Sequence, residues 1–248
     1  MIHLGLIGFP LQHSFSKSYI EACLAAMHVS GTYDNYELHD LNALLPLVRH
    51  VPLDGLNVTI PYKRAVLPYL DAIDETAAEV GAVNTICIDR KGHTVRLIGY
   101  NTDVIGFRIT LLPLLLAHHR MALVFGTGGA AAAVCYVLRD LGIDCTVVSR
   151  RRCAGTVMTY KDLTKAVLHA HTLLVNCTPL GMWPQIDTYL PIDYAALTSE
   201  HLVYDLVYNP EETSFMRLSR QHGATACNGL AMLHAQADAA LRIWLHDQ

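Results

Sequence analysis

The chain has 248 residues, of which 52% are hydrophobic and 16% are charged. This length and apolar content suit one or two domains with a real core and exclude an intrinsically disordered chain. The formal net charge is -4 with only 18 lysines and arginines, which excludes the basic footprint of a nucleic-acid-binding protein. The longest apolar stretch, Leu111–Ala117, contains Pro113 and is too short to cross a bilayer, so we expect no membrane partner.

The cysteines and histidines do not form a recognisable framework. There are seven cysteines, an odd number without a C-x-x-C pair, which argues against a disulfide scaffold and a zinc ribbon. The 14 histidines show no metal-ligand spacing, and we predict no metal site. The chain opens on the apolar run Ile2–Ile7 without a basic segment or a signal-like cleavage site, so we expect a cytoplasmic location.

Strand and helix patterns alternate along the first hundred residues, which predicts α/β layers with mostly parallel strands. We predict strands over Ile2–Ile7, Thr32–Leu38 and Gly55–Thr59, and a hairpin formed by Thr85–Asp89 and Val95–Gly99. Helical segments are predicted over Lys17–Met27, Leu41–Arg49, Val66–Leu70 and Thr76–Val80.

The strand–glycine–helix pattern restarts near Asn101, which predicts a second α/β domain and a cleft between the two. We predict its helices over Ala130–Leu141, Asp162–Ala170 and Thr213–His222, after a first helix that Asn101 or Thr102 caps and that runs through Leu116. The tail over Leu230–Trp244 is predicted to be an amphipathic helix. Its strands are predicted over Met121–Phe125, Cys145–Val148, Thr172–Cys177 and Leu202–Leu206.

A glycine-rich turn, Gly126-Thr127-Gly128-Gly129-Ala130, lies between a predicted buried strand and a predicted helix. A bound phosphate needs backbone N–H donors at a helix N-terminus and no side chain in the way, so this turn predicts a dinucleotide site. About 20 residues further on, where NAD-binding proteins usually carry an acid, stand Ser149 and the arginines 150–152. Guanidinium groups match phosphate geometry, which favours NADP over a merely solvated basic turn.

Three polar clusters, 13–16, 57–63 and 99–103, follow predicted strands in the first hundred residues. Ligands of open α/β sheets bind beyond the carboxyl ends of the strands. We therefore expect one polar small molecule to be bound by Ser14, Ser16, Asn57, Thr59, Asn84 and Asp103. Lys63 is the nearby group that can give or take a proton. Any one of these residues could equally be a turn, cap or surface residue, and the hypothesis rests on the set.

Seven motifs in this order resemble the shikimate dehydrogenase family, and the similarity covers nearly the whole chain. The motifs are Gly8–Ser16, Asn57–Lys63, Gly81–Thr85, Asn101–Asp103, Asn176–Met182, Tyr204–Pro210 and Gly229–Ala237. The resemblance implies an α/β substrate-binding domain over 1–101, completed by a C-terminal helix over 229–248, and a Rossmann-like, doubly wound NADP-binding domain over 102–228. It also implies the reversible reduction of 3-dehydroshikimate to shikimate with NADPH, a step of the shikimate pathway toward chorismate and the aromatic amino acids.

The same resemblance implies a role for each matching residue. Lys63 would be the acid/base group and Asp103 its partner at the reacting oxygen. Ser14 and Ser16 would hold the substrate carboxylate with Tyr208 nearby, and the residues that bind or support the ring hydroxyls would be Asn57, Thr59, Asn84 and Gln236. The pyrophosphate would lie on Gly126, Gly128, Gly129 and Ala130, the 2′-phosphate on Ser149 and Arg150, and the path of the adenosine and nicotinamide along Thr178, Leu206 and Gly229.

Two alternatives stay open. One is an NAD(P)-dependent quinate/shikimate dehydrogenase, and the residues after Val148 discriminate, because an acid there would favour NAD. The other is a non-catalytic NADP-binding regulatory module, against which the intact Lys63 and Asp103 argue. In each case we expect small-molecule partners and a monomer or homodimer.

Overall fold

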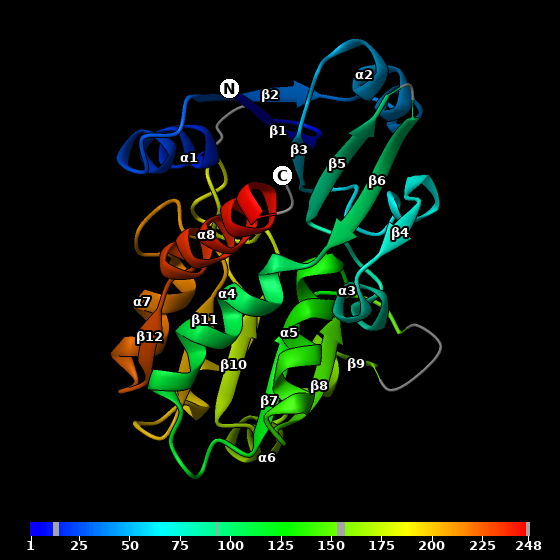
Figure 1. The fold of residues 1–248 in the computed structure, drawn as a ribbon. Helices are drawn as coiled ribbons and strands as arrows, with labels where there is room; N and C mark the ends of the chain where they lie inside the picture. Colours follow the sequence, from blue (N-terminus) through cyan, green and yellow to red (C-terminus); the bar gives the residue numbers. More distant parts are fainter. Residues whose placement is uncertain (12–14, 93, 153–156, 247–248) are drawn as a thin grey trace. The chain divides into compact units, whose positions relative to one another are not determined.

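The computed structural model describes residues 1–11, 15–92, 94–152 and 157–246 (Figure 1). The chain divides into two compact units, one made of Met1–Gly106 with Leu233–Gln248 and the other of Phe107–Met232. Each unit is built on its own six-stranded sheet with helices, which confirms the predicted α/β fold class. The domain limits expected from the sequence, 1–101 with 229–248 and 102–228, stay predictions.

The sheet of the first unit has the strand order β2-β1-β3-β5-β6-β4. Its strands are β1 (Ile2–Gly8), β2 (Gly31–Glu37), β3 (Gly55–Val58), β4 (Ala72–Ile73), β5 (Thr85–Lys91) and β6 (Thr94–Tyr100). β1 pairs in parallel with β2 and β3, whereas β5 is antiparallel to both β3 and β6. The carboxyl ends of β1 and β3 therefore lie side by side, next to the start of β5.

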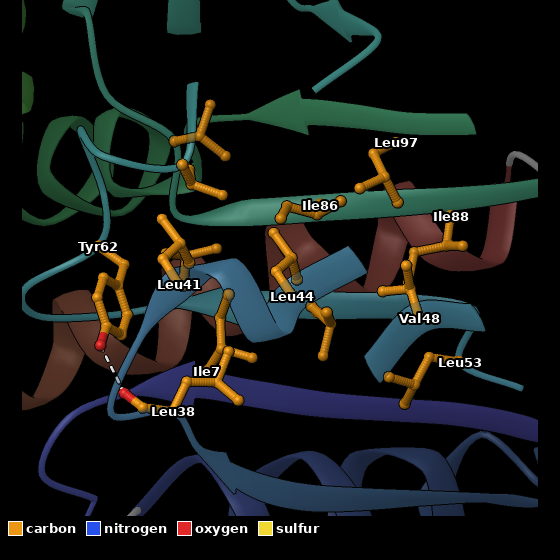
Figure 2. Close-up of a cluster of buried hydrophobic side chains, with 14 of the residues drawn as sticks. Ile7, Leu38, Leu41, Leu44, Val48, Leu53, Tyr62, Ile86, Ile88 and Leu97 are labelled. Carbon is orange, nitrogen blue, oxygen red and sulfur yellow. Dashed lines mark hydrogen bonds between the residues drawn. The ribbon is translucent and has the colours of Figure 1, made fainter. Parts of the chain in front are cut away.

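Helices cover both faces of this sheet. They are α1 (Phe15–Ala26), α2 (Leu44–His50), α3 (Glu75–Val80) and most of α8 (Leu230–His246), with short 3-10 turns over Leu41–Ala43 and Leu67–Tyr69. On one face, Leu44 and Val48 of α2 point toward Ile86 and Ile88 of β5 (Figure 2). The helical segment predicted over 66–70 is only the second of these 3-10 turns.

On the opposite face, α1 and α8 pack against β1 and β2. Trp244 of α8 is almost fully buried, and its indole Nε1 donates to the backbone oxygen of Ile86 at 3.0 Å. Gly55 of β3 makes this close approach possible, because a Cβ there would lie 2.2 Å from Trp244 Nε1. The C-terminal helix is thereby attached to the first unit, where Gln236 lies beside Asn84 and Thr102.

The sheet of the second unit is entirely parallel, with the strand order β12-β11-β10-β7-β8-β9. Its strands are β7 (Met121–Phe125), β8 (Asp144–Ser149), β9 (Val157–Thr159), β10 (Leu173–Asn176), β11 (Leu202–Asp205) and β12 (Thr225–Cys227). Counted from β7 as the first strand, this is the 3-2-1-4-5-6 order of the doubly wound dinucleotide-binding fold. The order reverses between β7 and β10, so ligands are expected beyond the carboxyl ends of these two strands.

The helices of this unit are α5 (Gly129–Asp140), α6 (Lys165–Ala170) and α7 (Ser214–Gln221), and α4 (Thr102–Leu111) leads into it from the first unit. Short 3-10 turns span Leu112–Leu114, Tyr160–Asp162 and Tyr194–Ala196. α5 lies along β7 and β8 (Figure 1), and Phe125, Leu168 and Phe215 belong to the core cluster of the unit. Among the described residues, no helix combines the length and apolar character that a bilayer crossing requires.

Two helix predictions are wrong at one end. The helix predicted through Leu116 ends at Leu111, because Pro113 lacks a backbone N–H and the next residues form a 3-10 turn. Its start is as expected, since Asn101 Oδ1 accepts a capping bond from Val104 N at 3.3 Å. The helix predicted over 162–170 begins only at Lys165, where Thr164 Oγ1 caps it.

Candidate functional site

Lys63 and Asp103 form a nearly buried ion pair in the first unit. Lys63 Nζ lies 2.6 Å from Asp103 Oδ2, and the two side chains are only 17% and 7% exposed. Lys63 stands in the turn after β3, where its carbonyl accepts from Val83 N at 2.7 Å. Asp103 stands in the first turn of α4. An ammonium has three N–H donors, so after the bond to Asp103 two remain for a ligand, as far as the described residues show.

Asn84, directly before β5, holds Asp103 in place. Its Nδ2 donates to Asp103 Oδ1 at 2.9 Å and to Thr102 Oγ1 at 3.0 Å, and its Oδ1 accepts from Thr102 N at 2.7 Å. A longer contact of 3.3 Å joins Asn84 Nδ2 to Gln236 Oε1 on α8. These bonds attach the start of α4 and a turn of α8 to the residue that precedes β5. Asp103 is thereby oriented from two sides, by an amide and by an ammonium.

Asn57, in β3, extends this network toward α1. Its Nδ2 donates to Thr85 Oγ1 at 3.2 Å and to the Asn84 carbonyl at 3.3 Å, and its Oδ1 accepts from the Tyr33 hydroxyl at 2.8 Å. Burial raises the pKa of Tyr33, and a hydrogen bond from Ser16 in α1 opposes that rise. The network of hydrogen bonds therefore runs without a break from Tyr33 to Asp103.

The structure joins the predicted catalytic residues Lys63 and Asp103 to three of the predicted substrate residues, Asn57, Asn84 and Gln236. Ser16, in α1, acts on the pKa of Tyr33, which bonds to Asn57. Thr59 follows β3 and is half-buried. Ser14 lies outside the described residues. Tyr208 is a half-buried residue of the second unit whose pKa is raised by burial, and its part in substrate binding stays a prediction.

The glycine turn follows β7 as predicted. Gly126 has a φ of 119°, and a Cβ there would lie 3.1 Å from the carbonyl oxygen of Cys177, which follows β10. Gly128 is the N-cap of α5, no side chain caps the helix there, and a Cβ would meet nothing within 4 Å. The first N–H groups of a helix have no partner within the helix, so the start of α5 at Gly129 and Ala130 presents donors to open space.

The basic segment begins at the end of β8. The Ser149 hydroxyl donates to the Arg151 carbonyl, whereas the Arg150 side chain is exposed. The positive charge of Arg150 lowers the pKa of Tyr160, although burial raises that pKa more. Arg152 contacts Asp162 at 3.2 Å. The Arg150 side chain, directly after β8, is exposed and forms no ion pair with a described residue.

Residues at the carboxyl ends of β10 and β11, and in the loop that leads from β11 to α7, surround Asp205. Its carboxylate accepts from Thr213 Oγ1 at 2.6 Å, Asn176 Nδ2 at 2.9 Å and Val207 N at 3.0 Å. Burial raises the pKa of Asp205 to about 6, and these hydrogen bonds partly oppose the shift. Asp205 was not among the residues singled out, because an acid at the end of a strand carries no signal of burial.

The residues around Asp205 also contact the predicted cofactor-binding residues Thr178, Leu206 and Gly229. Asn176 Oδ1 accepts from both the backbone N and the hydroxyl of Thr178, at 2.9 and 2.7 Å. Gly229 N donates to the Val207 carbonyl at 3.1 Å, and a Cβ at Gly229 would lie 2.2 Å from the Leu206 carbonyl oxygen. Only glycine therefore fits against Leu206 in this arrangement.

A doubly wound sheet with a glycine turn, together with a separate unit that holds a nearly buried lysine–carboxylate pair, defines a dinucleotide-dependent oxidoreductase of small molecules.

The family model described as shikimate dehydrogenase substrate binding domain matches residues 6–86. The shikimate dehydrogenase (NADP(+)) of Symbiobacterium thermophilum is 38% identical and covers 97% of this chain and 88% of its own length. The shikimate dehydrogenase (NADP(+)) of Clostridium beijerinckii is 34% identical, and the match covers 97% of this chain and 90% of that protein. The chain belongs to the shikimate dehydrogenase family.

Solved structures agree with this assignment. Shikimate dehydrogenase 1 from Peptoclostridium difficile is similar with a TM-score of 0.87 and 31% identity, covering 99% of this chain and 92% of that one. The Thermus thermophilus enzyme in complex with NADP(H) and shikimate is similar with a TM-score of 0.86, 30% identity, and 99% and 94% covered. A quinate dehydrogenase from Corynebacterium glutamicum in complex with NAD reaches a TM-score of 0.85 at 32% identity, with 99% and 94% covered.

Proposed function

We propose that this protein catalyses the reversible, NADPH-dependent reduction of 3-dehydroshikimate to shikimate, a step of the shikimate pathway. The observation that carries the proposal is the Lys63–Asp103 pair at 2.6 Å, embedded in a network of amide and hydroxyl groups. Such a network suits a small polyhydroxylated acid, because each ring hydroxyl needs a placed donor or acceptor. Membership of the family supports the choice of reaction.

The proposed chemistry assigns a distinct task to each residue of the pair. NADPH supplies a hydride to the carbonyl carbon when it is bound. As the carbonyl oxygen gains negative charge, the Lys63 ammonium stabilises that charge and donates the proton that completes the hydroxyl group. Asp103 holds Nζ by a charge-assisted bond and is itself held by Asn84. In the oxidation direction the neutral amine of Lys63 takes the proton back.

The remaining first-unit residues would bind and orient the substrate. In our proposal Ser14 and Ser16 donate hydroxyl bonds to the carboxylate, and Tyr208 is a further substrate-binding residue. The ring hydroxyls would be bound or supported by Asn57, Thr59, Asn84 and Gln236. The influence of Ser16 on the pKa of Tyr33 and the hydrogen bond from Tyr33 to Asn57 support this grouping, because they relate the proposed carboxylate end to the proposed hydroxyl end.

The residues of the second unit fit NADP. The absent side chain at Gly128 and the uncapped start of α5 leave room and donors for a pyrophosphate, which would lie on Gly126, Gly128, Gly129 and Ala130. The exposed guanidinium of Arg150, beside Ser149, would bind the 2′-phosphate. The adenosine and nicotinamide path would follow Thr178, Leu206 and Gly229.

A second candidate is an NAD(P)-dependent quinate/shikimate dehydrogenase, which the likeness to the quinate dehydrogenase bound to NAD favours. Initial rates with shikimate or quinate, each with NADP or NAD, separate the two candidates. We expect the fastest turnover with shikimate and NADP, and NADPH oxidation with 3-dehydroshikimate well above a blank without substrate. Faster turnover of quinate with NAD would contradict the proposal, and no turnover of any pair would favour a regulatory NADP-binding module.

The finer partner and location assignments belong to the same proposal. We propose that the protein works in the cytoplasm on small molecules, as a monomer or homodimer. Light scattering during size-exclusion chromatography measures the oligomeric state, and a mass near four subunits would contradict it. Cell fractionation tests the compartment.

A further inference from the structure

Tyr33 occupies an unusual place for a core residue of β2. Its side chain is fully buried and packs in the cluster that α1 and α8 form over β1. Its hydroxyl, however, reaches the polar network and donates to Asn57 Oδ1 at 2.8 Å. A buried phenol needs a hydrogen-bond partner, and the partner of this one, Asn57, is a residue of the proposed substrate site.

The hydrogen bonds of Asn57 determine which way its amide points. The two N–H groups of Nδ2 go to the Asn84 carbonyl and to Thr85 Oγ1. Rotating the amide by half a turn would place Oδ1 against the Asn84 carbonyl oxygen, a contact between two acceptors. An amide oxygen accepts two hydrogen bonds, and Tyr33 supplies one of them. No other described residue donates to Oδ1, so its second acceptor position can accept a hydrogen bond from a ligand.

We propose that Tyr33 is a positioning residue of the substrate site, whose hydroxyl holds the Asn57 amide so that its oxygen accepts a hydrogen bond from a hydroxyl group of the substrate. The ligand class is a cyclic polyhydroxy acid, and the inference rests on the proposed function. Thr85 acts on the same amide from the other side, because it accepts the bond from Nδ2 at 3.2 Å. Tyr33 itself needs no contact with the substrate.

Tyr33→Phe tests the inference because it keeps the buried ring and removes only the hydroxyl. Losing one bond of this kind corresponds to a rise of about five- to tenfold in the KM for shikimate. The KM for NADP stays unchanged, and kcat changes by less than about twofold, because Lys63 and Asp103 keep their geometry. The matched control is Tyr36→Phe on the same strand, whose half-buried ring packs against the other core cluster. This control leaves both KM values unchanged.

A double-mutant cycle with Asn57→Ala shows whether Tyr33 acts through Asn57. If it does, Tyr33→Phe raises the KM for shikimate in the wild-type background but adds nothing when residue 57 is already alanine. Equal effects in both backgrounds, or an unchanged KM in a folded Tyr33→Phe protein, overturn the inference. Should Tyr33→Phe fail to fold, Thr85→Val frees the same amide, and an unchanged KM for shikimate in that variant overturns the inference too.

The outcomes for the proposed function are separate. A wild-type protein that turns over neither shikimate nor quinate contradicts the proposed function and this inference with it. A wild-type protein active on shikimate, combined with an unaltered Tyr33→Phe variant, contradicts the inference alone. If quinate is the better substrate, the same cycle is measured on quinate with the same expected pattern.

Discussion

Lys63 Nζ lies 2.6 Å from Asp103 Oδ2, although 40 positions of the chain separate the two residues. Lys63 is held by the backbone bond from Val83, and Asp103 by the amide of Asn84, so the sequence segment 82–84 supports both partners. Contacts within the protein therefore hold both the ammonium and the carboxylate. This preorganisation is what electrostatic and acid–base catalysis require.

Asp103→Asn should lower kcat for shikimate oxidation by about 10²-fold, with little change in thermal stability. The amide cannot offer a negative charge to the ammonium, so Nζ loses the bond that orients it. Steady-state kinetics and a thermal melt measure the two effects. Asp89→Asn is the matched control, since Asp89 pairs with the exposed Lys91 at 3.0 Å in the same unit. Wild-type kcat in the Asp103→Asn variant would contradict a role for this carboxylate.

Gly128→Ala should raise the KM for NADPH by about tenfold or more without destabilising the fold. Its φ of -79° suits alanine, and the new Cβ would meet no atom of the protein within 4 Å. The methyl group would instead occupy the space proposed for the pyrophosphate. Gly126→Ala should differ, because its φ of 119° and the nearby Cys177 carbonyl make alanine strained, so its melting temperature falls. An unchanged KM for NADPH in folded Gly128→Ala would place the phosphate elsewhere.

Arg150→Ala should raise the KM for NADPH by about tenfold and leave the KM for NADH nearly unchanged. The exposed guanidinium has a charge-assisted bond to offer a 2′-phosphate, which NADH lacks. Arg217→Ala on α7 is the control for loss of one exposed positive charge in the same unit. Equal changes for the two cofactors would show that Arg150 does not recognise the 2′-phosphate.

Asp205 should make the stability of the protein depend on pH. Burial raises its pKa from 3.8 to about 6, so the folded state binds this proton more tightly than the unfolded state does. The resulting stabilisation is present below about pH 4 and is lost as the pH rises through about 6. The unfolding free energy of the wild type, relative to Asp205→Asn, should therefore fall by about 2 kcal/mol between pH about 4 and pH about 6. Denaturant titrations of both proteins measure it, and a difference independent of pH would contradict the shift.

The parts of the fold that the sequence could predict are those with local signals. The strand over 121–125 is a continuous apolar run ending in glycine, and the structure has β7 over the same residues. β4, β9 and β12 were missed because they contain only two or three residues and exist through pairing with a neighbouring strand. The end of α4 was predicted too late because the apolar pattern continues beyond Pro113. The α-helix itself cannot continue there, since proline lacks the backbone N–H that an α-helix needs.

The candidate site divides in the same way. Lys63, Asn84 and Asp103 stand in recognisable motifs after or before strands, so their meeting could be expected. Tyr33 lies in the predicted strand Thr32–Leu38, and this prediction says nothing of where its hydroxyl group bonds. The bond from Tyr33 to Asn57 joins residues 24 positions apart, and no spacing rule of a single strand or helix predicts such a contact. Pairings of this kind follow from the register of β1 with β2 and β3.

The most direct test of the account is kcat for shikimate oxidation with NADP in Lys63→Ala. Loss of the ammonium removes both the charge at the reacting oxygen and the proton acceptor, so we expect kcat to fall by about 10²- to 10⁴-fold. The KM for shikimate should change far less, and Lys91→Ala, which removes a lysine 82% exposed in the same unit, should match the wild type. A folded Lys63→Ala protein with near wild-type kcat would contradict the central claim that Lys63 performs the proton transfer.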